Sequence, residues 1–227
     1  MPEKKQKKAI FSLKERKDAL YLQSKALFLQ SLLPLTTIMK TQNTSFIPQT
    51  NDYRCLKAFQ KAECIYDVTW HFAHRFLEKG DRTIDQMVQA ARSGKQNIAE
   101  GVAAGNTSRE TEMRLTNVAK ASLQELLIDY EDYLRVRGLE QWDTASDKYQ
   151  QARRACMAHN DSAYYRAALP DRSDETIANI AITLIHQTDV LLQGLIEAKK
   201  EQFLQRGGIR EELSRARHEQ FDKKNKG

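Results

Sequence analysis

Apolar side chains recur at helical intervals along almost the whole chain after residue 51. In the first segment, about residues 53–79, they follow alternating three- and four-residue steps, as on one face of an α-helix. Gly80 is typical of a helix end. The predicted face comprises Leu56, Phe59, Glu63, Tyr66, Trp70, Ala73 and Leu77, widened by Ile65, Phe72 and Phe76. The alternation typical of a β-strand is not found after residue 51.

A second helix is predicted to begin after Asp81 or Thr83, because Thr83 and Gln86 have the spacing of a capping box. It ends at Gly105-Asn106, and its apolar face comprises Ile84, Met87, Val88, Ala91, Gly94, Ile98, Gly101 and Val102. This helix is rich in small residues, namely Ala90, Ala91, Ser93, Gly94, Ala99 and Gly101. Because a glycine inside a helix costs about 1 kcal/mol relative to alanine, the composition indicates close packing against a neighbour.

A third helix is predicted from Thr107, which has capping-box spacing with Glu110, to Gly138. Its apolar face comprises Leu115, Val118, Ala119, Ser122, Leu123, Leu126, Leu127, Tyr130, Tyr133 and Leu134. The following residues, 139–173, are less regular. A helix is expected at 147–160, and a short turn or helix at 161–169.

The last main helix is predicted to begin near Ser173, a favourable N-cap, and to end at Gly207-Gly208. Its apolar face comprises Ile177, Ile180, Ala181, Leu184, Ile185, Thr188, Leu191, Leu192, Leu195 and Ile196. Four long amphipathic helices with short connections predict an all-α fold, an antiparallel four-helix bundle over residues 51–205. Residues 138–172 are a helical insertion before the fourth helix. Residues 206–227 form a basic C-terminal tail, which we expect to be helical only when bound.

The net charge of +6 is unevenly distributed. Residues 1–50 contain nine Lys/Arg and three Asp/Glu, residues 51–205 contain 20 and 23, and residues 206–227 contain seven and four. The corresponding net charges are +6, −3 and +3. The basic character therefore lies at the two ends of the chain, and any site for a polyanion on the bundle must be a local patch.

Residues 1–50 are expected to be a poorly structured basic extension. Their apolar run, Ala26 to Met39, is interrupted by Gln30 and Pro34 and is too short to span a membrane. One hypothesis is that translation begins at Met39. The three cysteines are odd in number and lack metal-ligand spacing, which favours a reducing, cytoplasmic environment.

Three runs occur in a fixed order: Asn97-Ile98-Ala99-Glu100-Gly101, then Ser108-Arg109-Glu110, then Ser122-Leu123-Gln124-Glu125-Leu126. Their order and spacing resemble a bacterial four-helix-bundle family. That family includes proteins encoded in intervening sequences of large-subunit ribosomal RNA genes, and the accessory protein of diversity-generating retroelements. The resemblance covers roughly residues 53–135 and, more loosely, 173–205. The 138–172 insertion and the tail look like its four-helix-bundle-suffix subgroup.

The resemblance implies a non-enzymatic bundle that assembles into rings, with pentamers expected. In the retroelement accessory proteins it also implies a basic surface that binds nucleic acid and docks a reverse transcriptase. This chain departs from them at the core, which is slightly acidic where theirs is strongly basic.

Basic residues on the second and third helices are the candidate nucleic-acid-binding residues: Arg82, Arg92, Lys95, Arg109, Arg114 and Lys120. Residues 86–124 contain five basic and three acidic residues, whereas 125–147 contain two and seven. One end of the bundle would therefore attract phosphate, and a ring would repeat the patch. The alternative is a solvated helix face with i,i+4 pairs such as Glu110 with Arg114.

Other candidate chemistry is weaker. His71 and His74 have a spacing that could hold a metal, but Thr183 stands where a matching glutamate would precede His186. The run Ser93-Gly94-Lys95 lacks the earlier glycine of a phosphate-binding loop. We expect no metal, no cofactor and no catalytic residue.

The remaining polar and aromatic candidates have structural interpretations. Glu63, Asn97 and Glu100 are expected to pair within the bundle or a ring interface, and Cys64 and Cys156 to be buried. Six tyrosines could stack bases, but most lie at core spacing: Tyr53, Tyr66, Tyr130, Tyr133, Tyr164 and Tyr165. The pair Tyr164-Tyr165, in the insertion, is the exception.

Two functional hypotheses follow. The first is a self-associating accessory protein that associates with RNA or DNA, or with a nucleic-acid-processing complex, through phosphate contacts. The second is an oligomeric scaffold that binds a protein partner without nucleic acid. No membrane association is expected.

Overall fold

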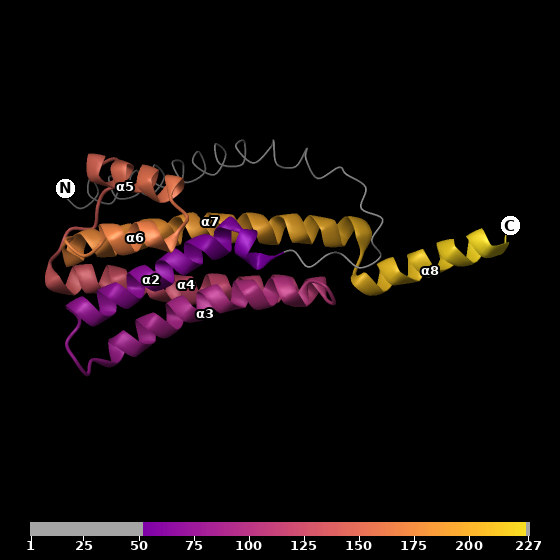
Figure 1. Cartoon of the computed structure of the whole chain (residues 1–227), viewed down its shortest axis with the longest axis horizontal. Coiled ribbons are helices and arrows are strands. Elements are labelled where there is room, and N and C mark those ends of the chain that lie inside the picture. Colours follow the sequence, from indigo (N-terminus) through magenta and orange to yellow (C-terminus); the bar gives the residue numbers. More distant parts are fainter. Residues whose placement is uncertain (1–51, 226–227) are drawn as a thin grey trace, which may run out of the picture. The chain divides into compact units, whose positions relative to one another are not determined.

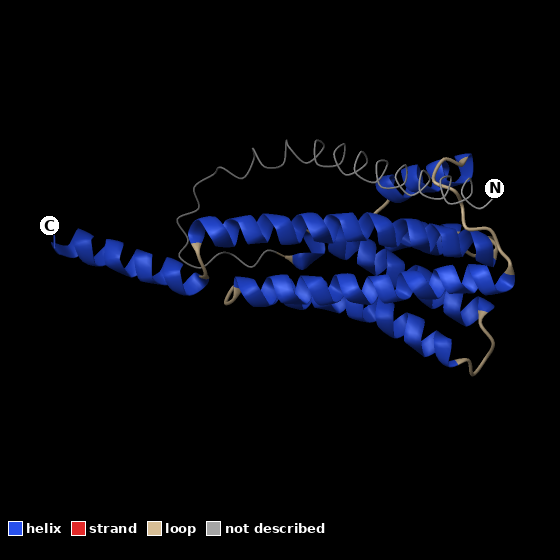
Figure 2. Cartoon of the chain, turned by 180° about the vertical axis from the view of Figure 1, so that it is seen from behind, coloured by secondary structure: helices blue, strands red, loops and turns tan. Residues whose placement is uncertain are grey.

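The computed structural model of the chain describes residues 52–225, and every regular element in that range is a helix (Figures 1 and 2). The predicted all-α class is thereby confirmed. The expectations for residues 1–50, including a start at Met39, lie outside the described residues.

The first predicted helix is divided in two. A 3-10 turn, η1 (Tyr53–Cys55), precedes helix α2 (Lys57–Phe76). The turn forms because the Asp52 carboxylate accepts the Arg54 backbone N–H, and Leu56 is extended between the two elements. The later helices are α3 (Arg82–Ala104), α4 (Arg109–Arg137), α5 (Asp147–Ala158), α6 (Ser162–Ala168), α7 (Asp174–Arg206) and α8 (Ile209–Asn225).

The predicted start of α3 after Asp81 is confirmed, whereas the start of α4 is displaced by one residue. The N-cap of α3 is Asp81, whose carboxylate accepts the Thr83 N–H at 2.8 Å. The N-cap of α4 is Ser108 rather than Thr107, and its Oγ accepts the Thr111 N–H at 3.1 Å. Both caps have extended backbones, and only such a residue can direct its side chain at the free N–H groups of the first turn. The capping boxes inferred from the sequence were therefore wrong.

The ends predicted for the second, third and fourth helices are confirmed, whereas α2 ends earlier than predicted, at Phe76, with Leu77 and not Gly80 as its C-cap. Helix α3 ends at Gly105, and α4 ends at Gly138, whose φ of +66° is the left-handed conformation that a glycine adopts readily. Ser173 caps α7 as expected, because its Oγ accepts the Thr176 N–H. The tail differs from expectation. Residues Ile209–Asn225 form helix α8 in the single chain, with two glutamates in its favourable first turn.

The long helices α2, α3, α4 and α7 lie side by side (Figure 1). Helix α3 packs on α2 and α4, and α7 also packs on α2 and α4. The shorter α6 packs on α2, and α5 packs on α7. The result is an all-helical, bundle-like fold. No helix in the range 52–225 is long and apolar enough to cross a membrane.

The buried face of α2 is rotated from the predicted one. Ile65, Val68 and Phe72 are fully buried, whereas Glu63 and Trp70 are exposed. The reason is that α2 contacts α3, α7 and α6 at once. Its covered surface is therefore broad, and the outer edge of the predicted stripe reaches solvent.

The close packing predicted for α3 occurs against α4. A β-carbon on Gly94 would lie 2.7 Å from Leu123 Cδ2 and 2.8 Å from its Cγ. Beside this contact, Ser93 Oγ and Ser122 Oγ are 2.9 Å apart and share a hydrogen bond. The glycine thus allows a buried leucine to occupy the space where its own side chain would be.

The connection from α4 to α5 is attached to α7 by Asn179, a buried residue that the sequence pattern does not single out. Its Nδ2 donates to the carbonyls of Glu140 and Glu175, both at 2.8 Å. Its Oδ1 accepts the Trp142 backbone N–H at 2.8 Å. One amide therefore satisfies three backbone groups and fixes the start of the insertion.

Substitution of Gly94 tests the α3–α4 contact. We expect Gly94→Ala to reduce the free energy of unfolding by roughly 1–2 kcal/mol, because the displacement of Leu123 outweighs the better helix propensity of alanine. The matched control is Gly194→Ala in α7, where a β-carbon meets nothing within 4 Å. That change should stabilise the protein by up to about 1 kcal/mol. If Gly94→Ala and Gly194→Ala change the free energy of unfolding equally in urea denaturation, the packing of Gly94 against Leu123 is contradicted.

Candidate nucleic-acid interface

The six predicted basic residues lie in three different environments. Arg82, Arg92 and Arg114 are exposed and have no hydrogen-bond or ion-pair partner among residues 52–225. The pairing of Arg114 with Glu110 that the sequence allowed is not formed. These three guanidinium groups, on α3 and α4, keep their full capacity to bind an anion.

Lys95 is directed toward α2. Its ammonium nitrogen lies 4.4 Å from the centre of the Tyr66 ring, a cation–π contact. The residue is only half-buried, so the charge remains close to solvent.

Lys120 is directed toward α7, away from α3. Its ammonium donates to Gln193 Oε1 at 2.8 Å and lies 3.5 Å from Asp189 Oδ1. The neighbouring Gln124 donates to the same carboxylate at 3.0 Å. Lys120 is therefore engaged in the α4–α7 contact, and its predicted role in phosphate binding is not supported by its position.

Arg109 is buried at the first position of α4, with 8% of its surface exposed. Its Nη1 donates to the Gly207 carbonyl and its Nη2 to Glu212 Oε1, both at 2.7 Å. The guanidinium thus joins α4 to the end of α7 and the start of α8. As with Lys120, its contacts are structural, which argues against the predicted role in binding nucleic acid.

Glu112 forms a second ion pair next to Arg109. It is 4% exposed, and its Oε1 lies 2.8 Å from Lys199 Nζ on α7. Its carboxylate occupies the space that a side chain at Gly105 would take. Two adjacent, largely desolvated charge pairs therefore hold α4 against the C-terminal part of the chain.

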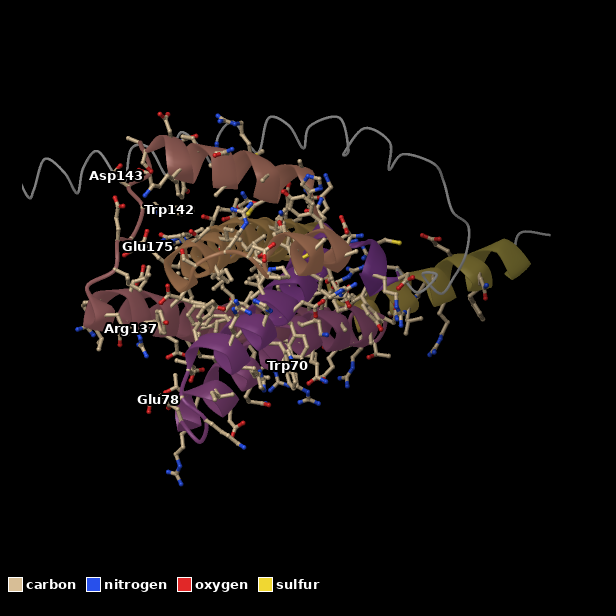
Figure 3. All side chains as sticks on the ribbon, turned by 60° about the vertical axis from the view of Figure 1, so that its left-hand side comes forward. Trp70, Glu78, Arg137, Trp142, Asp143 and Glu175 are labelled. Atoms are coloured by element: carbon tan, nitrogen blue, oxygen red, sulfur yellow. The ribbon has the colours of Figure 1, made fainter. Side chains whose placement is uncertain are left out.

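The aromatic residues of α2 were assigned to the core by their spacing, but three lie near its outer surface. Tyr66, Trp70 and His74 are one helical turn apart, and Trp70 is 49% exposed. Trp70 is labelled in Figure 3. The signal in the sequence is the i, i+4, i+8 row, which the apolar stripe obscured. Other tyrosines are packed as expected: Tyr130 donates to Thr69 Oγ1 at 3.0 Å, and Tyr133 donates to Asp174 at 2.9 Å.

The two tyrosines of the insertion are also packed, whereas the sequence pattern had set this pair apart from the tyrosines at core spacing. Tyr165 is buried and donates to the His159 carbonyl at 3.1 Å. Tyr164 stacks on the His159 ring at 3.6 Å.

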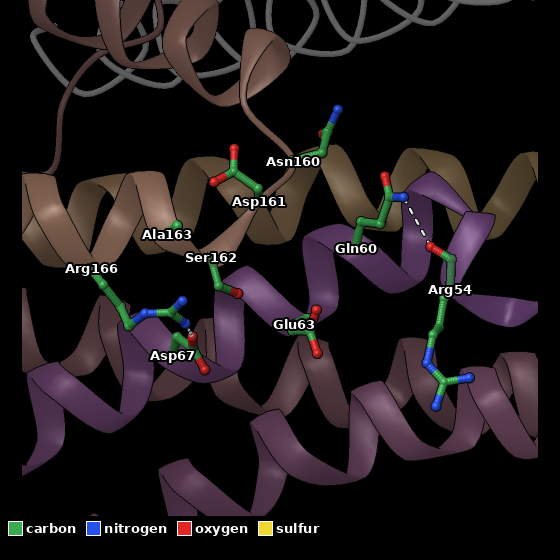
Figure 4. A pocket seen from close by; sticks show the side chains of 9 residues that line it. All are labelled: Arg54, Gln60, Glu63, Asp67, Asn160, Asp161, Ser162, Ala163 and Arg166. Atoms are coloured by element: carbon green, nitrogen blue, oxygen red, sulfur yellow. Dashed lines mark hydrogen bonds and ion pairs between the residues drawn. The ribbon is translucent and has the colours of Figure 1, made fainter.

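The polar cavity between α2 and the α5–α6 connection, about 790 Å³ in volume, does not bring free reactive groups together (Figure 4). Arg166 pairs with Asp67 at 2.5 Å, and Asp161 accepts the Tyr164 N–H as the cap of α6. The Glu63 carboxylate lies apart from these groups. Within residues 52–225, no three His, Cys, Asp or Glu side chains are placed to hold a metal.

The buried titratable groups near this cavity are poorly suited to chemistry. Burial raises the pKa of the Cys64 thiol to about 12 and also raises the pKa of Cys156, so both stay protonated. Burial lowers the pKa of Lys61, whose Nζ donates to the Cys156 carbonyl at 2.5 Å. The predicted burial of both cysteines is confirmed.

Comparison of this chain with family models, curated proteins and solved structures found no match. The resemblance noted from the sequence therefore rests on its motif residues alone.

The buried pair of Glu112 and Lys199 can be tested directly. We expect Lys199→Met to reduce the free energy of unfolding by about 2–3 kcal/mol, because it leaves a buried carboxylate without a partner. The control is Lys148→Met, which removes an exposed pair with Glu140 and should change stability by less than about 0.5 kcal/mol. Similar losses for both variants in chemical denaturation would show that Glu112 is well solvated.

Proposed function

We propose that this protein is a non-enzymatic, self-associating accessory protein that binds RNA or DNA through the outer surface of α3 and the adjoining part of α4. The observation that supports this most is the exposure of Arg92 and Arg114 without partners on α3 and α4, where Arg109 and Lys120 are engaged in contacts within the chain.

The fold within this proposal is an antiparallel four-helix bundle of α2, α3, α4 and α7. The cyclic order of contacts, α2 to α3 to α4 to α7 and back to α2, supports it. So does the short connection from α3 to α4, residues 105–108, which returns the chain alongside itself.

Arginine suits the proposed role because its planar guanidinium can donate two parallel hydrogen bonds to one phosphate. Arg82 and Arg92 are ten residues apart on α3, which is about 15 Å along the helix axis. Arg114 extends the surface onto α4. Contacts at several separated phosphates, without base-specific hydrogen bonds, would give salt-dependent binding of low sequence specificity.

Charge reversal on α3 and α4 tests the proposal. We expect Arg92→Glu/Arg114→Glu to weaken binding of a fluorescent oligonucleotide at least tenfold at low salt, and to reduce the salt slope by about one for each phosphate that the variant no longer neutralises. Arg154→Glu changes an exposed arginine of α5 and is the control for the single variants Arg92→Glu and Arg114→Glu, each of which alters the net charge by the same amount. The proposal is contradicted if the control and the double variant weaken binding equally, or if the wild-type protein binds neither RNA nor DNA.

A second candidate function is a scaffold that binds a protein partner, such as a reverse transcriptase, without nucleic acid. The observation that favours it is the exposure of three apolar residues spread along α4: Val118, Ile128 and Val136. Such side chains are suited to a contact between protein surfaces. The same three residues support self-association, for which we propose a ring, with a pentamer as the expected form.

The role of these α4 residues in self-association is testable. We expect the wild-type chain to be oligomeric by light scattering, and Ile128→Glu/Val136→Glu to shift it toward monomer, because two charges would be desolvated in the contact. Thermal unfolding of the dissociated variant should remain cooperative, since both side chains are exposed within the chain. A monomeric wild-type protein, or an oligomer unaffected by both substitutions, would refute this assignment.

A further inference from the structure

The outer surface of α2 has an ordered aromatic row. The Trp70 indole stacks on the His74 ring, with centroids 4.1 Å apart and planes 29° from parallel. Tyr66 lies on the other side, at 6.3 Å. The His74 ring is held in place because its Nδ1 lies 2.8 Å from the Trp70 carbonyl and donates to it. The indole is therefore oriented before any ligand binds, although about half of it is exposed to water.

Cations of α3 border this row. Lys95 lies over Tyr66. This contact shows that these two residues lie at the same level along α2 and α3. Since α2 and α3 are joined by a short connection and pack on each other, they run in opposite directions. Moving one turn along α2 from Tyr66 to Trp70 therefore corresponds to moving about one turn back along α3, from Lys95 to the level of Arg92. Residues three apart share a helix face, so Arg92 and Lys95 both flank the aromatic row.

We propose that Tyr66, Trp70 and His74, flanked by Arg92 and Lys95, bind unpaired bases of a single-stranded nucleic acid. This inference rests on the proposed function and specifies its substrate. Exposed aromatic rings beside cations are the means by which proteins hold single strands, since bases stack on the rings while the cations neutralise the phosphates. A duplex, whose bases are already stacked, would reach only the arginines.

The charges on this surface distinguish a nucleic acid from an apolar partner. A protein surface that covered Trp70 would also have to desolvate the exposed Arg92 guanidinium, which has no carboxylate partner among the described residues. Among the carboxylates of this segment, Asp67 pairs with Arg166 of α6, Glu63 lies two turns before Trp70, and Glu78 follows the end of α2. A polyanion with flat apolar bases satisfies both features.

The test compares the full chain on two probes of one sequence, a single-stranded oligonucleotide and its duplex. We expect Trp70→Ala to weaken single-strand binding about tenfold or more, to leave duplex binding within about twofold, and to leave the melting temperature unchanged. Trp70→Phe should recover part of the single-strand affinity. Binding of the single strand should also quench the fluorescence of the wild-type protein, and this quenching should disappear in Trp70→Phe.

The outcomes separate this inference from the proposed function. If Trp70→Ala binds each probe as tightly as the wild type does, while Arg92→Glu/Arg114→Glu binds both more weakly, base stacking is overturned and nucleic-acid binding through the arginines stands. Failure of the wild-type chain to bind either probe would overturn both. If Trp70→Ala does not fold, two other results decide: a weaker single-strand affinity for Trp70→Phe than for the wild type, and quenching of the wild-type fluorescence. If neither is observed, the inference is overturned.

Discussion

The close approach of α3 and α4 is the contact on which the rest of this structure depends. It is possible because Gly94 has no side chain where the buried Leu123 lies, and the Ser93–Ser122 hydrogen bond closes the gap beside it. Once α3 is held at this distance, its opposite edge lies against α2 and its outer edge faces solvent. Arg92 lies two residues before Gly94 on α3, so this contact sets the position of its backbone.

Charge is divided between two roles along the same helices. Arg109, Glu112 and Lys120 bind partners in the C-terminal half of the chain. Because these contacts are largely shielded from water, loss of a partner would lower the free energy of unfolding. Arg92 and Arg114 are left without partners at the surface. A sequence-level count of basic residues merges these two groups. The smaller group of exposed side chains is the one relevant to a polyanion, and in the proposed single-strand site Arg92 of this group flanks the α2 aromatic row.

Much of the fold could be predicted from local signals. The helical periodicity, the glycine ends at Gly105 and Gly138 and the small residues of α3 all act within a turn or two of the chain. The errors arose where distant partners decide. Arg109 donates hydrogen bonds to Gly207 and Glu212, about a hundred residues away. No local sequence pattern around Arg109 predicts these partners. Trp70 fits an apolar stripe, but which edge of a stripe is covered depends on the angles at which α3, α6 and α7 pack on α2.

The central claim is that the helical core, and not the more basic ends of the chain, contacts nucleic acid. Photocrosslinking of the full chain to a single-stranded oligonucleotide containing 5-iodouridine, followed by mass spectrometry of the linked peptides, tests it most directly. We expect crosslinks to α2 at or beside Trp70, with further links in α3. Crosslinks confined to residues 1–50 or to α8, where the basic charge is concentrated, would contradict it.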